Sequence, residues 1–161
     1  MKAPTRYPEP QDFVSAIAKP FDSEPGAKVV GPFGTTWSDA VKLDSGLEIY
    51  TISAPLLGID FTFKDEGIVF EREYHDAGEG PFLLTDVSFW GHEDGYESYK
   101  GPLWKDLQLS DALADVQGKL GAPTSVGRRD IHFWELPDFT LTIQWKAPKK
   151  IRVISYWMKE D

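Results

Sequence analysis

The clearest pattern in the chain lies in its last third, where the spacing of apolar residues changes from helical to alternating. Apolar residues first recur every three or four positions, which predicts a helix with one apolar stripe. Ser110 is placed to cap the start of this helix, and Gly121 followed by Pro123 is placed to end it. The stripe consists of Leu109, Leu113, Val116 and Leu120.

Three strand-like runs follow this helix, at residues 131–136, 139–145 and 150–157. In the middle run apolar and polar residues alternate strictly, so one face of the predicted strand is apolar and the other is polar. The outer two runs carry the β-branched and aromatic residues that favour a pleated surface. The pattern therefore predicts a helix packed on a three-stranded antiparallel meander.

The first half of the chain repeats this order in outline. Residues 11–19 read as a short helix that Pro20 ends, and strands are predicted at residues 47–53, 57–63 and 68–74. The polar turn between the last two runs indicates a hairpin.

We therefore expect an α+β fold made of two α-β-β-β halves, whose strands can continue into one curved sheet. The 161 residues form one domain, with a first half at 9–90, a connecting loop at 91–106 and a second half at 107–161. Residues 27–46 are expected to be an irregular insertion because Gly31-Pro32 and Gly34 interrupt them, and residues 82–90 are expected to form an extra strand. Two ordinary α+β segments without a duplication are the alternative.

Composition narrows the functional classes. A hydrophobic share of 41% is enough to bury a core, and no cysteine is present for a disulfide, a thiol nucleophile or a thiolate metal site. The N-terminal residues show no apolar signal region, and no run of about 18 apolar residues is present to cross a bilayer. We expect a cytoplasmic protein that does not bind membranes.

The net charge of −9 is concentrated in residues 60–97, which contain eleven acidic residues against Lys64 and Arg72. Such a run is often only a solvated face. The alternative is an electrostatic surface for a basic protein partner, because complementary potentials accelerate association. Nucleic acid is disfavoured as a partner, because phosphates are bound by Lys and Arg.

Aromatic residues accompany these acids in the connecting loop, where they either fold back on the core or are presented to a partner. If they are presented, aromatic anchors ringed by polar groups form a candidate partner-binding surface. Its predicted members are Glu71, Glu73, Asp76, Glu79, Trp90, His92, Glu93, Asp94, Tyr96, Glu97, Tyr99 and Trp104.

Evidence for catalysis is weak in this sequence. His75 and His92 lie near carboxylates but lack the short spacing of a zinc site, and His132 is expected to face solvent or a neighbouring sheet. Glu71 and Glu73 share one face of a predicted strand, which is also usual for a half-exposed sheet. No nucleophile elbow, P-loop, dinucleotide fingerprint or H-E-x-x-H motif is present. We predict no catalytic residues, no metal and no cofactor.

The segment LQLSDALADVQGKLGAPTSVGRRDIHFWEL, followed by FTLTIQW and KIRVISYW, resembles a known type of unit. A helix ending in LG-x-P, a strand with Trp and a two-stranded return is similar to the outer-membrane assembly lipoprotein and β-lactamase-inhibitor-protein superfamily. The whole layout also resembles small acidic immunity proteins encoded beside polymorphic bacterial toxins. The chain departs from the secreted inhibitors because it has no cysteine for their disulfides.

The resemblance implies a cytosolic inhibitor that binds a cognate toxin with a basic surface and occludes its active site. Two other functions stay open. One is a peptide-binding or assembly module that uses an apolar groove between helix and sheet. The other is a small hydrolase that uses His75 or His92.

Overall fold

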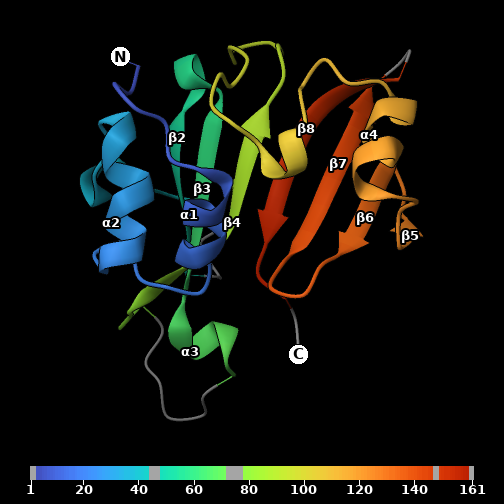
Figure 1. Cartoon of the computed structure of the whole chain (residues 1–161). Helices are drawn as coiled ribbons and strands as arrows, with labels where there is room; N and C mark the ends of the chain where they lie inside the picture. Colours follow the sequence, from blue (N-terminus) through green and yellow to red (C-terminus); the bar gives the residue numbers. More distant parts are fainter. Residues whose placement is uncertain (1–2, 44–47, 72–77, 147–148, 160–161) are drawn as a thin grey trace.

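The computed structural model describes residues 3–43, 48–71, 78–146 and 149–159. Within them the strands form one antiparallel sheet in the order β1-β2-β3-β4-β8-β7-β6-β5, so β4 and β8, far apart in sequence, are neighbours at its centre (Figure 1). The expected α+β class is confirmed. The strands are β1 Val41–Lys42, β2 Ile49–Ala54, β3 Ile59–Asp65, β4 Phe82–Trp90, β5 Ser125–Val126, β6 Ile131–Glu135, β7 Thr140–Lys146 and β8 Lys150–Trp157.

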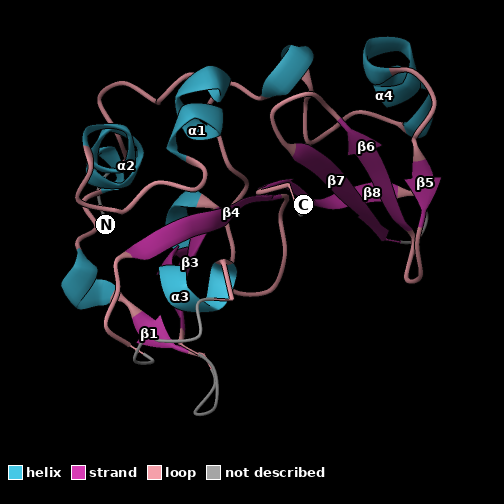
Figure 2. Ribbon diagram, turned by 90° about the horizontal axis from the view of Figure 1, so that it is seen from below, coloured by secondary structure: helices cyan, strands magenta, loops and turns pink. Residues whose placement is uncertain are grey.

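Helices cover only one face of this sheet. Figures 1 and 2 both place α1, α2 and α4 on the same side, whereas α3 follows the end of β3. No helix in the described part of the chain has the length and apolar run that a bilayer crossing requires. The helices are α1 Pro10–Ala16, α2 Glu24–Val30, α3 Glu66–Val69 and α4 Leu113–Leu120, with short 3-10 turns at Gly31–Phe33, Trp37–Asp39, Pro55–Leu57 and Trp104–Asp106.

Rings from sheet and helix meet in the core between these two layers. The ring of Phe13 in α1 lies 5.0 Å from Phe89, 6.4 Å from Phe61 and 6.5 Å from Tyr156, measured between ring centroids. All four side chains are fully buried. Burying one such ring stabilises the fold by about 1.5–3 kcal/mol, so this cluster fixes how α1 sits on the central strands.

Most strand predictions are confirmed to within two residues, and the runs 82–90 and 150–157 coincide with β4 and β8. The second-half helix begins later than expected, at Leu113. Its first turn is capped by Asp115, whose carboxylate accepts the Ala112 N–H at 2.9 Å. The residues before it form a separate turn, which Asp111 closes by accepting the Gln108 N–H. Ser110 is therefore not the cap.

Two predictions in the first half are wrong. The expected strand at 68–74 begins instead as helix α3, because the Asp65 carboxylate accepts the Gly67 N–H at 2.8 Å and caps a helical turn. Its remaining residues, 72–74, lie outside the described residues. The insertion expected to be irregular is partly ordered: α2 begins at Glu24 after Ser23, whose hydroxyl accepts the Gly26 N–H at 3.2 Å.

Asp65 also holds the chain between β3 and β4. It is fully buried, and its second carboxylate oxygen accepts the N–H groups of Gly78 at 3.1 Å and Gly80 at 2.9 Å. Buried donors that lose their acceptor carry a desolvation cost. One side chain therefore ties both ends of this connection to the sheet.

We expect Asp65→Ala to lower the free energy of unfolding by about 3 kcal/mol, because it leaves backbone donors without their charged acceptor. Urea denaturation measures the change. The matched control is Asp94→Ala, an exposed loop acid, which should stay within about 0.5 kcal/mol of the parent. A loss below 1 kcal/mol for Asp65→Ala would contradict this role.

Candidate binding surface on the open sheet face

We call the sheet face that points away from α1, α2 and α4 the open face. Residues directly paired across antiparallel strands present their side chains on the same face, so the register gives its composition. A row of small polar residues crosses five strands at its centre, and the hydroxyls of Ser88 and Ser155 lie 2.8 Å apart within it. This central row is Ser53, Asp60, Ser88, Ser155 and Thr142.

A second row runs beside the first and contains the most exposed ring of this face. Trp157 on β8 is 39% exposed, and its Nε1 donates to the Thr142 hydroxyl at 2.7 Å, which fixes the direction of the indole. Its direct neighbour on β4 is Asp86, which is only 7% exposed. The second row is Thr51, Thr62, Asp86, Trp157, Thr140 and Glu135.

The open face is hollowed over β6, β7 and β8. The hollow has a volume of about 490 Å³, which lies in the range of ligand pockets. Hydroxyls from the two rows form part of its lining, and apolar side chains form most of the remainder. Its lining includes Ile131, Phe133, Thr142, Val153, Trp157 and Met158.

Asp60, on the β3 side of the central row, binds the connecting loop through its carboxylate. Its Oδ2 accepts hydrogen bonds from Trp90 Nε1 and from the Tyr96 hydroxyl, both at 2.9 Å. The two rings stack at 4.6 Å between centroids. Burial and the bond to Asp60 raise the pKa of Tyr96 to about 12. Trp90 and Tyr96 are therefore held in place on the open face.

Asp86 is the unusual acid of this surface. Burial raises its pKa to about 6, and hydrogen bonds from the hydroxyls of Thr85 and Thr62 offset only part of that effect. The Thr85 hydroxyl lies 3.2 Å from its Oδ1. Among the described residues Asp86 forms no ion pair, so a carboxylate that is largely ionised at neutral pH sits in the sheet without a counter-ion.

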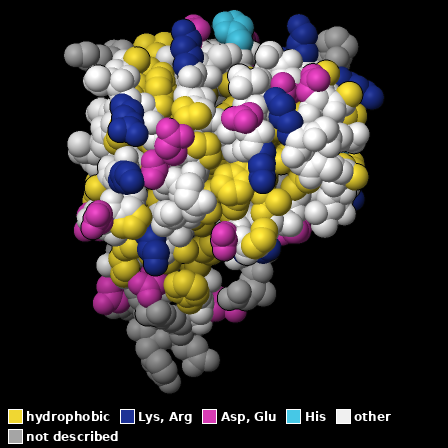
Figure 3. Space-filling model, viewed as in Figure 1, with side chains coloured by type: hydrophobic (Ala, Val, Ile, Leu, Met, Phe, Trp, Pro, Cys, Tyr) yellow, Lys and Arg dark blue, Asp and Glu magenta, His cyan; other side chains and the backbone are white. Residues whose placement is uncertain are grey.

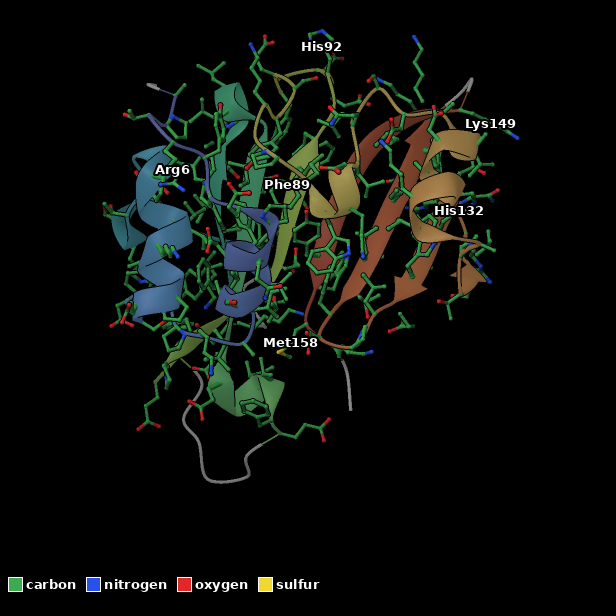
Figure 4. The ribbon with its side chains drawn as sticks, in the orientation of Figure 1. Arg6, Phe89, His92, His132, Lys149 and Met158 are labelled. Carbon is green, nitrogen blue, oxygen red and sulfur yellow. The ribbon has the colours of Figure 1, made fainter. Side chains whose placement is uncertain are left out.

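The predicted loop acids are partly neutralised from within the chain. Glu93 lies 3.0 Å from the Lys146 ammonium and 3.9 Å from the Arg152 guanidinium, which ties the loop to the ends of β7 and β8. His92 is exposed at the end of the sheet opposite Met158 (Figure 4), and its Nδ1 lies 3.9 Å from the Glu97 carboxylate. Asp94 and Glu97 are exposed beside them.

Tyr99 and Trp104 pack on the helix side, so for these two rings the alternative of folding back on the core is the one observed. Tyr99 is 5% exposed, and its ring lies 4.8 Å from Phe89 and 5.4 Å from Tyr7. Trp104 meets Phe139 edge to face at 5.0 Å. Neither ring lies on the open face, and a buried Tyr99 cannot serve as a surface anchor.

The remaining predicted acids lie elsewhere. Glu71 and Glu79 are exposed at the ends of the connection between α3 and β4, whereas Glu73, Asp76 and His75 lie outside the described residues. The acidic segment is therefore divided among the α3 end, the open face and the loop. On the helix-covered face acidic and basic side chains are interspersed (Figure 3).

The sequence prediction omitted Asp60, Asp86, Ser88 and Trp157 from the surface. Strand alternation contains a signal for the first three, because positions 60, 62 and 64 on one strand and 86, 88 and 90 on another share one face. Trp157 lacks such a local signal. It joins them only because β8 pairs with β4.

The histidines form no metal centre in the part of the chain that is described, where no three acidic or histidine side chains gather to hold an ion. His132, expected to face solvent or a neighbouring sheet, is half-buried on the helix side of β6. Its ring lies 6.0 Å from both Trp134 and Trp145, which belong to the core on the helix side. It therefore packs against rings and does not join the open face.

The raised pKa of Asp86 predicts a specific pH dependence of stability. The folded state binds this proton more tightly than the unfolded state, so the free energy of unfolding should fall as pH rises from about 4 to about 6. Asp86→Asn removes this cost and should stabilise the protein at pH 7 by about 1–3 kcal/mol, with little gain at pH 4. Thermal or urea unfolding across this range measures it. If Asp86→Asn changed the free energy of unfolding by the same amount at pH 4 and at pH 7, the predicted pH dependence would be wrong.

Comparisons of the chain with protein-family models, with curated proteins and with solved structures found no match. The open face, with its hydroxyl row, its two aspartates and its tryptophans, therefore carries the functional proposal.

Proposed function

We propose that the protein is a non-catalytic inhibitor of the immunity type, which binds a basic toxin on the open face and occludes its active site. The observation that carries the proposal is Asp86, a carboxylate that pairs with no cation among the described residues and lies opposite Trp157, whose exposed ring lines a hollow. A carboxylate in that setting lowers stability, so its presence is easier to explain by binding than by folding.

The dimensions of the open face suit a protein partner. Eight antiparallel strands spaced about 4.8 Å apart span about 33 Å, and a six-residue strand is about 20 Å long. The resulting area is comparable to the roughly 800 Å² that one partner contributes to a standard interface. No helix among the described residues covers this area (Figure 2).

We also infer that the sheet consists of two halves, within residues 9–90 and 107–161. The strand order supports this, because β1 to β4 and β5 to β8 each run from an outer edge to the centre, and each series begins with a two-residue strand. Joining the halves through β4 and β8 produces a binding face wider than either half offers alone.

The charge of this surface favours a basic partner. Asp60, Asp86 and Glu135 supply negative charge against Lys64 and Lys159, whose ammonium lies 3.8 Å from Glu135, and the protein as a whole carries −9. Glu93, Asp94 and Glu97 add acidic groups in the loop at one end. Complementary potential of this kind steers association and makes its rate depend on ionic strength.

A peptide-binding or assembly module is the second candidate. The apolar lining of the hollow favours it, because Ile131, Phe133 and Val153 offer contact area without charge. Binding led by apolar contact depends little on salt, whereas binding led by acidic groups weakens as salt rises. The ionic-strength dependence of affinity therefore separates the two functions.

The direct test is to mix the purified protein with the product of the adjacent reading frame and to follow complex formation by calorimetry. We expect a stoichiometric complex whose affinity falls at least tenfold between 50 and 500 mM NaCl. Absence of a complex at the lower salt concentration would reject the immunity function. A complex with unchanged affinity at the higher concentration would favour the assembly module.

Trp157→Ala should weaken that complex by at least tenfold, because truncating a central aromatic contact commonly costs about 2 kcal/mol or more. The matched control is Val126→Ala. Val126 is 64% exposed but pairs with His132, whose ring packs on the helix side, and we expect its truncation to leave affinity unchanged. Equal effects of the two substitutions would place the interface away from the open face.

A further inference from the structure

Asp86 differs from the other carboxylates that the sheet holds. Asp65 is satisfied by backbone N–H groups, whereas Asp60 accepts two aromatic donors on Oδ2 and has no hydrogen-bond partner for Oδ1 among the described residues. The donors around Asp86 are the hydroxyls of threonines, and in the described part of the chain no cation pairs with it. A buried carboxylate gains most from a charged donor, so this group has unused capacity to bind one.

The charged surroundings of Asp86 come from β3 alone. Lys64 favours its ionised form weakly, and Asp60 opposes it. On the other side, β8 contributes no charge and places Trp157 directly opposite. Asp86 is 7% exposed and does not itself line the hollow, whereas Trp157 opposite it does.

The Trp157 ring is oriented and partly exposed. Its only polar atom is already bonded to Thr142, so the indole is oriented before any ligand arrives. At 39% exposure the ring remains accessible, and directly paired side chains stand about 4.5–5.5 Å apart at their Cβ atoms. A largely buried carboxylate and a partly exposed indole are thus neighbours across β4 and β8, and the indole lines the 490 Å³ hollow.

We propose that Asp86 and Trp157 form an anchor site for one guanidinium group, supplied by an arginine side chain of the protein that docks on the open face. This inference deepens the proposed function and rests on it. A guanidinium is planar, stacks on an indole and donates two parallel hydrogen bonds to a carboxylate. A lysine ammonium is more strongly hydrated and lacks that fork, so arginine is the better fit.

The hollow accommodates the rest of such a side chain. Its lining includes Met158, which follows Trp157, and Val153 farther along β8, which suit the methylene stem, while Ser155 lies between Val153 and Trp157 on the same face of the strand. Protonation of Asp86 removes the ion pair. Arginine binding should therefore weaken about tenfold from pH 7 to pH 5, as the ionised fraction of a group with a pKa of about 6 falls.

The test uses the full-length protein and two small probes, Nα-acetyl-arginine amide and its neutral citrulline counterpart. The ¹⁵N indole signal of Trp157, assigned through Trp157→Phe, reports binding by NMR. We expect the arginine probe to shift this signal with a millimolar Kd, and the citrulline probe to bind at least fivefold more weakly. Asp86→Asn should abolish that preference and the pH dependence, whereas the matched control Asp94→Asn should retain both.

Three results would overturn the anchor site: equal binding of the two probes, an unchanged preference in Asp86→Asn, or loss of the preference in Asp94→Asn. Each of them leaves complex formation with the adjacent gene product untouched, so the proposed function would survive. If instead the probes behave as expected and no complex forms, the site stands and the proposed function fails.

Discussion

The pairing of β4 with β8 is the constraint on which the remaining structure depends. On the helix side it buries Val87 against Tyr156 and Phe89 against Ile154, and all four side chains are inaccessible to solvent. β4 lies in the middle of the chain and β8 near its C-terminal end, so closing this pair carries a loop entropy that the buried contacts must offset. Without it the molecule would be two separate meanders.

The same pairing also creates the open face as a continuous surface. Ser88 and Ser155 bond across it, and Asp86 and Trp157 become neighbours through it. Such polar groups on central strands add little to stability, and Asp86 reduces it at neutral pH. A side chain that violates the local rules of folding is more often explained by what the surface binds.

The sequence predicts the elements better than it predicts the surface. The strands β4 and β8 were predictable because long runs of β-branched and aromatic residues have no competing helical spacing. Helix α2 was missed because Gly31-Pro32 and Gly34 led us to expect irregular chain from residue 27 onward, and its own residues include Pro25 and Gly26. Gly26 is required there since a Cβ would lie 2.1 Å from the Pro20 carbonyl oxygen.

Helix α3 shows the opposite error. The composition of residues 68–70 favours a strand. The Asp65 side chain nevertheless caps a helical turn by accepting the Gly67 N–H, and the chain continues as helix through Val69. Local hydrogen bonding at a strand end therefore outweighs a weak propensity, and no periodicity argument detects it.

The aromatic residues explain why the surface itself was hard to predict. Of the six tryptophans, Trp134 and Trp145 belong to the core, and Trp37 and Trp104 pack against it. Sequence alone cannot assign a ring to one layer or the other, because both layers draw rings from loops as well as strands. That assignment depends on the register at the centre of the sheet.

The connecting segment illustrates this division. It leaves β4 at Trp90, which stays on the open face with Tyr96, and then crosses to the helix side, where Tyr99 and Trp104 fill the core (Figure 1). The backbone N–H of Trp104 donates to the Tyr156 hydroxyl at 2.9 Å, and this bond attaches the segment to β8 where it crosses to the helix side. One loop thus supplies rings to both faces, so acids and aromatics that are adjacent in sequence are separated in space. The tryptophans that remain on the open face are Trp90, held by Asp60, and Trp157, which lies opposite an acid that pairs with no cation in the described part of the chain.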